Sequence, residues 1–249
     1  MIELREVSRS FLAERGRELI TTRALGPVTV SIPDLEFVSV LGRSGSGKTT
    51  LLRVIGGLSA PTTGDVLVDG QPVMRPGPDR AIVFQESALY PWRTVEANVR
   101  LGLELGRAPR ARTAAVARRY LELVGLTDFA RHYPNQLSGG MQQRVGLARA
   151  LAVEPRHLLM DEPFGSLDAI LRKELGAELL RIWEQERRTV VFVTHSVDEA
   201  LVLSDRVIVL RDGMIVRDLP VTAPRPRDPD VIIEDPAFLT LRRSLLEVL

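Results

Sequence analysis

The chain of 249 residues contains no cysteine, so it can form neither a disulfide bond nor a thiolate metal site. No apolar run approaches the roughly 18–20 residues that a membrane-spanning helix needs, so we expect membrane association only through a partner. The first residues carry acidic side chains and no apolar segment, so no secretory signal is expected. A formal net charge of +1 gives no electrostatic case for nucleic-acid binding.

Lysine is also scarce, and its position is informative. Lys48 and Lys173 are the only lysines among 33 basic residues, and Lys48 stands in the run Gly42-Arg-Ser-Gly-Ser-Gly-Lys-Thr49. A strand-like run, Glu36–Leu41, precedes this run and a helix-like run, Thr49–Gly56, follows it. Glycines let backbone N–H groups converge on phosphate oxygens, and a helix N-terminus favours an anion.

These features predict a phosphate-binding loop for a nucleoside triphosphate, and a glycine-rich turn that carries Lys-Thr by chance is the alternative. Lys48 would meet the β- and γ-phosphates, and the Thr49 hydroxyl would bind Mg²⁺. The candidate binding residues of the loop are Gly42, Arg43, Ser44, Gly45, Ser46, Gly47, Lys48, Thr49 and Thr50.

Hydrolysis also needs a carboxylate for Mg²⁺ and a group that polarises the attacking water. The apolar run His157–Met160 ends in Asp161 and Glu162. Because successive side chains of a strand diverge, we expect Asp161 to hold the Mg²⁺ shell and Glu162 to act as general base. His195 follows the strand-like run Thr189–Thr194, where ligands collect in α/β sheets, and is predicted to contact the γ-phosphate.

Gln85 ends another strand-like run, Ala81–Phe84. Its amide could ligate Mg²⁺, orient the water, or report the γ-phosphate to the segment that follows. The remaining histidines receive no ligand role. His157 begins a strand and is interpreted as structural, and His132 is assigned to a loop.

The run Leu137-Ser-Gly-Gly-Met-Gln-Gln-Arg144 is the most diagnostic motif after the phosphate-binding loop. With it and Ser166-Leu-Asp168 in this order, the chain resembles the ATPase subunits of ABC transporters over residues 2–248. The resemblance implies that the nucleotide is ATP and that two copies form a head-to-tail dimer. A plain P-loop kinase has no use for residues 137–144 and is excluded.

The same resemblance implies further binding residues. Ser138 and Gly140, with Gly139 between them, would contact the γ-phosphate held by a second copy, since a helix N-terminus remote from Lys48 suits a partner's anion. Asp168 would lie where the two copies cross. Phe11 would stack on adenine in place of the usual tyrosine.

The connecting segments resemble those of nitrate, sulfonate and taurine importers. This narrower resemblance implies a motor on the cytoplasmic face of the membrane that drives a permease, supplied by an extracytoplasmic binding protein, for a small anion such as a sulfonate, taurine or nitrate. The segments that carry it are Leu89–Val95, Asn98-Val99, Leu101–Leu105, Met160–Ala169, Phe192–Ala200, Pro224–Asp228, Asp235–Leu239 and Leu241–Leu249.

Some positions depart from the family pattern or stay open. Ser196 stands where the family commonly has aspartate, which could weaken a local contact, and Leu12–Leu25 is longer than usual. The segment Tyr90–Trp92 is expected to dock the permease, and the alternative is that Trp92 is buried in the helical region. The arginines of residues 100–119 are interpreted as a solvated helical face.

The order of elements predicts an α/β fold: a P-loop NTPase core with a parallel sheet, an N-terminal antiparallel β subdomain and an inserted helical subdomain. Within one domain, we assign residues 1–35 to the antiparallel region, 36–85 and 155–215 to the core, 86–154 to the helical subdomain and 216–249 to a tail. Other functions that remain open are an ABC exporter or lipid-transport ATPase and, less favoured, a soluble ABC ATPase that does not transport.

Overall fold

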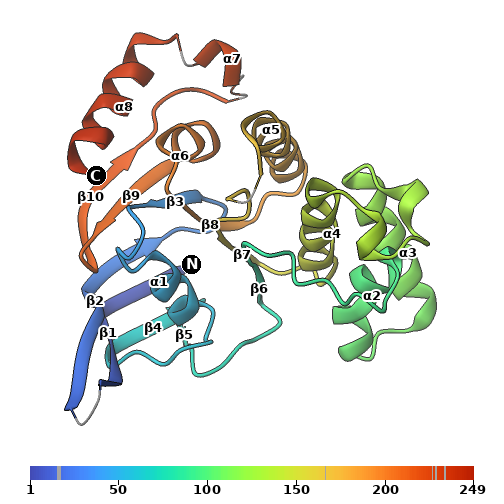
Figure 1. Ribbon diagram of the computed structural model, residues 1–249, viewed down its shortest axis with the longest axis horizontal. Helices are drawn as coiled ribbons and strands as arrows, with labels where there is room; N and C mark the ends of the chain where they lie inside the picture. Colours follow the sequence, from blue (N-terminus) through green and yellow to red (C-terminus); the bar gives the residue numbers. More distant parts are fainter. Residues whose placement is uncertain (16–17, 166, 226, 228, 233) are drawn as a thin grey trace. The chain divides into compact units, whose positions relative to one another are not determined.

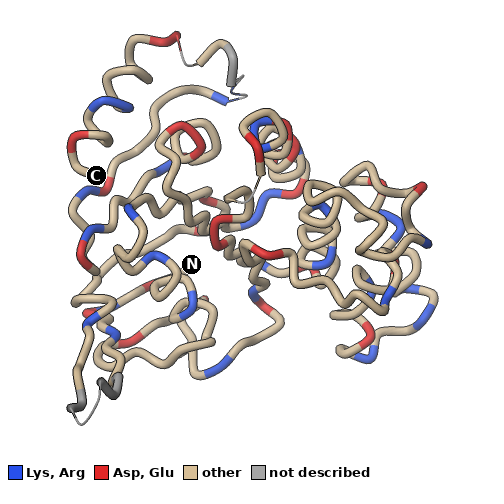
Figure 2. Tube along the Cα trace, viewed as in Figure 1, with Lys and Arg blue, Asp and Glu red and all other residues tan. Residues whose placement is uncertain are grey.

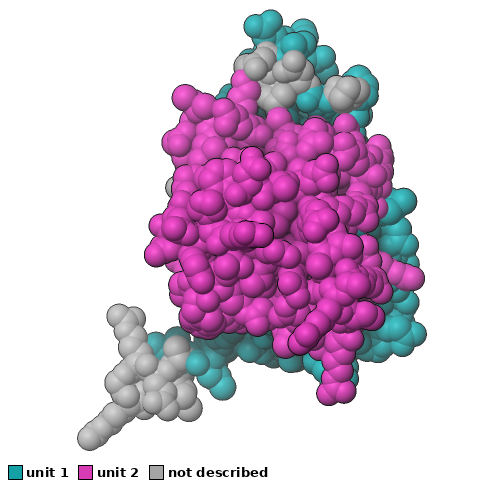
Figure 3. All heavy atoms as spheres, turned by 90° about the vertical axis from the view of Figure 1, so that its right-hand side faces the viewer, with its two compact units in different colours: residues 1–77, 188–249 teal, residues 78–187 magenta. Residues whose placement is uncertain are grey.

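The computed structural model describes residues 1–249 apart from residues 16, 17, 166, 226, 228 and 233. Ser166, part of the motif Ser166-Leu-Asp168, therefore lies outside the described residues. The described chain forms two compact units, one from residues 1–77 and 188–249 and the other from residues 78–187 (Figure 3).

The first unit contains an antiparallel sheet with the order β2-β1-β4-β5 (Figure 1). Strand β1, Ile2–Arg15, pairs with β2, Glu18–Ile32, to form a long hairpin. On its other edge β1 pairs with β4, Thr63–Val68, which pairs in turn with β5, Gln71–Pro72. Strands β4 and β5 thus belong to the antiparallel sheet, although the sequence placed residues 36–85 in the core.

A second group of strands in this unit has the order β10-β9-β3-β8. Strand β3, Phe37–Leu41, runs parallel to β8, Thr189–Thr194, and to β9, Arg206–Arg211, and β10, Met214–Pro220, is antiparallel to β9. Strands β3 and β8 are buried along their whole length, because valine-rich parallel strands are covered on both faces.

The helices of the first unit are α1, Lys48–Ile55, α6, Val197–Leu203, α7, Pro229–Ile232, and α8, Pro236–Val248. Helices α1 and α6 pack on the parallel strands, and α8 packs against α6 (Figure 1). The carboxyl ends of β3 and β8 therefore lead directly into α1 and α6, which are the connections that carry the candidate site.

The second unit pairs β6, Arg80–Val83, in parallel with β7, His157–Asp161. Its longer helices are α2, Val95–Leu105, α3, Arg110–Leu123, α4, Gly139–Ala152, and α5, Ala169–Gln185, and its short 3₁₀ turns are η1, Thr127–Phe129, and η2, Pro134–Gln136. Helices α2, α3 and α4 pack together. Parallel strands, antiparallel sheet and inserted helices confirm the predicted fold class.

The arginines of α3 are exposed, and Figure 2 marks all lysines and arginines in blue along the Cα trace. Helix α3 turns Ala117 and Tyr120 inward, whereas Arg112, Arg118 and Arg119 are exposed. The Arg112 guanidinium pairs with the Glu154 carboxylate at 3.1 Å. These contacts fit a solvated helical face. None of the helices in the described part of the chain has the length and hydrophobicity that a membrane crossing requires.

Candidate functional site

The phosphate-binding loop connects β3 to α1. Its last glycine, Gly47, has a φ of 99° and is the N-cap of α1, where no side chain caps the helix. A Cβ atom at this position would lie 2.4 Å from the carbonyl oxygen of Ala24, so the loop needs glycine here. The N-cap residue of α1 thus has no side chain that could compete with a phosphate for the N-terminus of the helix, which suits an anion site.

Lys48 is buried within this loop. Its Nζ atom donates to the carbonyl oxygens of Gly42 and Arg43, at 2.8 and 3.0 Å. Gly45, with a φ of 81°, has open space around the position of a Cβ atom. Of the other candidates, Arg43 and Ser44 are exposed, Thr49 and Thr50 are half-buried, and Ser46 is buried. The lysine charge thus lies inside the loop, where it can meet an incoming phosphate.

The carboxylates predicted for hydrolysis stand where β7 ends in the second unit. Asp161 is buried as the last residue of β7, and the half-buried Glu162 follows with a φ of 45°. A positive φ is uncommon for a residue with a side chain, and such strain clusters at functional sites. Because the backbone leaves the strand conformation between these residues, their carboxylates can serve different ligands.

Gln85 lies beside this acidic turn. The chain leaves β6 at Val83, and the exposed Gln85 follows two residues later. A Cβ atom on Gly165 would be 3.1 Å from Nε2 of Gln85 and 3.3 Å from the carbonyl oxygen of Glu162. The second unit therefore brings the Gln85 amide and the backbone of Glu162 close to Gly165, where a side chain would crowd both.

Ser138 is the N-cap of α4, with its Oγ atom accepting a hydrogen bond from the Met141 N–H at 3.3 Å. Ser138 and Gly139 are exposed, whereas Gly140 is buried against the Leu171 side chain. The start of α4 thus presents a capped but accessible helix N-terminus, which suits an external anion.

Asp168, which is predicted to lie between two copies, also makes hydrogen bonds within its own chain. Its carboxylate caps α5 by accepting from the N–H groups of Ile170 and Leu171, at 3.1 and 3.0 Å. Ile170, the second residue of α5, is exposed. The capping bonds fix the carboxylate at the beginning of the helix.

His195 is exposed between β8 and α6. The next residue, Ser196, caps α6 by accepting from the Glu199 N–H at 3.3 Å, and the Thr194 hydroxyl donates to the Glu199 carboxylate at 2.5 Å. Serine is among the preferred N-cap residues. Ser196, which stands in place of the family aspartate, therefore caps α6 directly beside the His195 imidazole.

Phe11 is exposed on β1, as an adenine-stacking ring must be. The guanidinium of Arg9 lies 4.7 Å from the centroid of the Phe11 ring, a cation–π distance. The assignment of Phe11 to adenine stays a prediction.

The segment after Gln85 carries an exposed aromatic pair. Trp92 is 71% exposed, so the alternative that it is buried in the helical region is wrong. Its ring lies 5.3 Å from that of Tyr90, centroid to centroid, in an edge-on arrangement. A surface pair of this kind is a suitable interface anchor.

Sequence reasoning missed the residues that hold this segment in place. The Asn98 side chain accepts from the Tyr90 N–H and donates to the carbonyl oxygens of Tyr90, Arg93 and Thr94. Arg149 of α4 donates to the carbonyl oxygens of Ser87 and Ala88, at 2.6 and 2.8 Å. Burial lowers the pKa of the Arg149 guanidinium.

In the sequence, the signal for the Asn98 contacts was a polar residue on an otherwise apolar face of the helix. Helix α4 and the segment after Gln85 are thus joined by hydrogen bonds within one unit.

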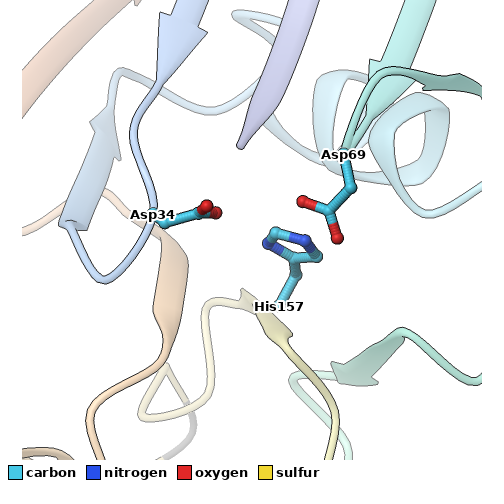
Figure 4. Close-up of side chains that lie close together, drawn as sticks. All are labelled: Asp34, Asp69 and His157. Carbon is cyan, nitrogen blue, oxygen red and sulfur yellow. The ribbon is translucent and has the colours of Figure 1, made fainter.

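Two acidic side chains outside these motifs, Asp34 and Asp69, are drawn in Figure 4. Both bind the amino group of Met1, Asp69 at 2.7 Å. Burial alone would lower the pKa of this amino group, but the hydrogen bonds to Asp34 and Asp69 raise it overall. His157, drawn in the same view, is the buried first residue of β7. The single ammonium group binds both carboxylates and offsets one of their two negative charges, so the acidic pair has a structural explanation.

Comparison with known families decides the identity of the chain. The family description "ABC transporter" matches residues 25–165. The chain belongs to the ABC transporter family. It is an ATP-binding subunit of the nitrate-type importer family, and it is an ATPase. The predicted family, the binding of nucleotide and the ATPase activity are thereby confirmed, while the roles of single residues stay predictions.

Several relatives of this ABC protein carry informative names. The nitrate import ATP-binding protein NrtD of Synechococcus elongatus is 45% identical over 98% of this chain and 89% of its own length. The bicarbonate transport ATP-binding protein CmpD of Synechocystis is 43% identical over 96% of this chain and 89% of its own. A solved dimeric, post-hydrolysis structure of the ATP-binding cassette MJ0796 with ADP and Pi has a TM-score of 0.78 and 36% identity, covering 90% of this chain and all of that one.

Proposed function

We propose that this chain is the ATP-hydrolysing motor of an importer that takes up a small anion, such as nitrate, taurine or another sulfonate, through a partner permease. The observation that carries the proposal is the 45% identity with a nitrate import ATP-binding protein over 98% of this chain. The name of another relative, CmpD, also refers to a small anion, bicarbonate. The importer subunit would lie on the cytoplasmic face of the membrane, attached through its permease.

The residue types and their places at the ends of strands support a division of labour in hydrolysis. Lys48 and the N–H groups of α1 would bind the phosphates, and Gln85 would orient the attacking water. Glu162 would take a proton from that water as its oxygen attacks the γ-phosphorus and the bond to the β-phosphate oxygen breaks. His195 would donate to the γ-phosphate.

The residues present fit a Mg²⁺ ion, since the Thr49 hydroxyl and the Asp161 carboxylate are hard oxygen donors. When bound, the ion would neutralise charge that develops on the phosphates. These two side chains would hold it, with the Gln85 amide as a further oxygen ligand.

The exposed start of α4 supports a two-copy arrangement. Each site would use Lys48 of one copy and Ser138 of the other, so that ATP closes the dimer and hydrolysis reopens it. The structural relative with a TM-score of 0.78 is dimeric in its post-hydrolysis state. Asp168 and the exposed Ile170 beside it would lie at the same contact.

The exposed pair Tyr90 and Trp92 would dock the permease, because the segment is tied both to Gln85 by sequence and to α4 by Arg149. Trp92→Ala should lose co-purification with the permease while ATP binding stays intact. Leu105→Ala is the matched control, since Leu105 is 76% exposed in the same unit. Co-purification of the Trp92→Ala protein at the level of this control would contradict the docking site.

Import is tested in proteoliposomes that contain this chain, its permease and its solute-binding protein. ATP hydrolysis should rise when nitrate, taurine, another sulfonate or bicarbonate is added together with the binding protein. Hydrolysis that responds to a lipid or hydrophobic compound without the binding protein would instead indicate an exporter or lipid transporter.

A further inference from the structure

Arg227, in the segment after β10, is a nearly buried arginine, 6% exposed. It donates to the carbonyl oxygens of Leu201, Val202 and Ser204 at the end of α6, the first two at 3.0 and 3.3 Å. It also donates to the carbonyl oxygens of Val221 and Ala223 in its own segment. One guanidinium thus joins the segment after β10 to the last turn of α6.

The contacts complement the charge at this helix end. The last carbonyl groups of a helix lack partners within it and carry partial negative charge, so a cation stabilises them. Burial, with repulsion from Arg225, lowers the pKa of Arg227 to about 10. The guanidinium therefore remains charged at neutral pH.

Arg225 extends the same attachment. Its Nη2 atom donates to the carbonyl oxygen of Leu203 at 2.5 Å, and its Nε atom pairs with the Asp205 carboxylate at 2.8 Å. The other oxygen of Asp205 accepts from the N–H of Phe37, the first residue of β3, at 3.0 Å. The end of α6 is therefore tied to the strand that leads into the phosphate-binding loop.

The opposite end of α6 is held by the final helix. Arg242 of α8 pairs with the Asp198 carboxylate in the first turn of α6, at 2.6 Å from its Nε atom. The side chain of Leu245 in α8 is fully buried, and α8 packs against α6 (Figure 1). Residues from beyond β10 thus contact both ends of α6.

Helix α6 begins at Val197, and only its cap residue Ser196 separates it from His195. The Ser196 N–H donates to the Thr194 hydroxyl at 3.0 Å, and that hydroxyl donates to Glu199 in α6. The imidazole is therefore carried on a turn whose geometry depends on where α6 lies.

We propose that the described residues from 221 to 249 form a clamp on α6 that positions His195 for ATP hydrolysis, with Arg227 as its main positioning residue. The proposal rests on the function proposed above for His195. Arg227 acts through the helix and does not itself contact the nucleotide. Loss of its hydrogen bonds would let the end of α6 shift, and small misplacements of a contact group reduce turnover more than binding.

The test compares Arg227→Met and Arg227→Lys in the full-length chain. Arg227→Met should lower kcat about tenfold and change the Kd for ATP less than about twofold, because Lys48 and α1 keep their contacts. Arg227→Lys should give an intermediate kcat, since an ammonium keeps the charge but reaches fewer carbonyl oxygens. Arg206→Met is the matched control, because Arg206 contacts Ser31, Glu36 and Asp218 rather than α6.

A double-mutant cycle separates positioning from general stabilisation. In a His195→Ala background, Arg227→Met should cause no further loss of kcat. A full further loss in that background would overturn the proposal, and so would wild-type turnover by Arg227→Met alone. If His195→Ala itself turns over at the wild-type rate, the role of His195 falls, and the catalytic purpose of the clamp falls with it.

If Arg227→Met does not fold, the proposal is tested at Arg242, the exposed contact between the clamp and α6. Arg242→Gln removes only the surface pair with Asp198, so it should fold, lower kcat about two- to threefold and leave the Kd for ATP unchanged. Turnover equal to that of the wild type would overturn the clamp, and so would an equally large loss of turnover when Arg242→Gln is added to His195→Ala.

Discussion

Asn98 should be the residue whose loss most directly releases the surface of Tyr90 and Trp92. Its side chain is completely buried and makes hydrogen bonds to the backbone at Tyr90, Arg93 and Thr94. In Asn98→Ala, the Tyr90 carbonyl keeps its bond from the Arg93 N–H, and the Thr94 carbonyl keeps its bond from the backbone N–H of residue 98. The loss therefore falls on the Tyr90 N–H and the Arg93 carbonyl.

Each of these backbone groups should cost about 1–1.5 kcal/mol when its partner is removed, because both lie partly within reach of water. Their sum lowers the free energy of unfolding by about 2–3 kcal/mol. For a chain of this size, that corresponds to a fall in melting temperature of roughly 5–10 °C. Asn135→Ala is the matched control, because Asn135 is exposed and the same substitution there should change stability by less than about 0.5 kcal/mol.

The fluorescence of Trp92 gives a local readout in the same experiment. The chain has two tryptophans, so Trp183→Phe leaves Trp92 as the single probe. Adding Asn98→Ala to this protein should lower the fluorescence anisotropy of Trp92, since its turn is no longer held to α2. An unchanged melting temperature together with unchanged anisotropy would refute the reasoning that Asn98 organises this surface.

Further predictions concern the catalytic and nucleotide-binding residues. Glu162→Gln should lower hydrolysis by roughly 10²–10⁴ while Mg·ATP still binds and a closed dimer accumulates, as measured by phosphate release and size-exclusion chromatography. Lys48→Ala should instead lose nucleotide affinity in equilibrium binding and stay monomeric. Phe11→Ala should weaken ATP binding about tenfold with nearly unchanged kcat. Ser196→Ala should lower the free energy of unfolding by about 1 kcal/mol through loss of the α6 cap, measured by urea titration.

The parts of this fold that the sequence predicted are those governed by local pattern. The run Phe37–Leu41 is apolar except for Ser39 and its strand is buried along its whole length, while glycines mark the loop that follows. The pairing of Thr63–Val68 with β1 was not predicted, because strand partners depend on contacts between distant segments. Nothing in the composition of that short strand distinguishes a strand of the antiparallel sheet from a strand of the nucleotide-binding core.

In the candidate site, too, the sequence predicted what a local pattern marks and missed what depends on the folded backbone. Gln85 and Glu162 were predicted from their places at strand ends, and the second unit brings both against Gly165. The left-handed backbone of Glu162 was not predictable, since glutamate has no preference for a positive φ. That conformation is imposed by the turn, in which the Gly165 N–H donates to the Glu162 carbonyl at 3.0 Å.

Arg227 shows why a sequence pattern can hide a structural residue. In a segment that alternates proline and arginine, each arginine resembles a solvated linker charge, and arginines are mostly exposed in proteins. A guanidinium can be buried only where several acceptors converge on its N–H groups. Here the acceptors come from the end of α6 and from Val221 and Ala223, and they meet only after the chain has folded back. Arg227 is remote in sequence from every nucleotide motif. Its hydrogen bonds nevertheless connect it directly to α6, the helix that follows His195.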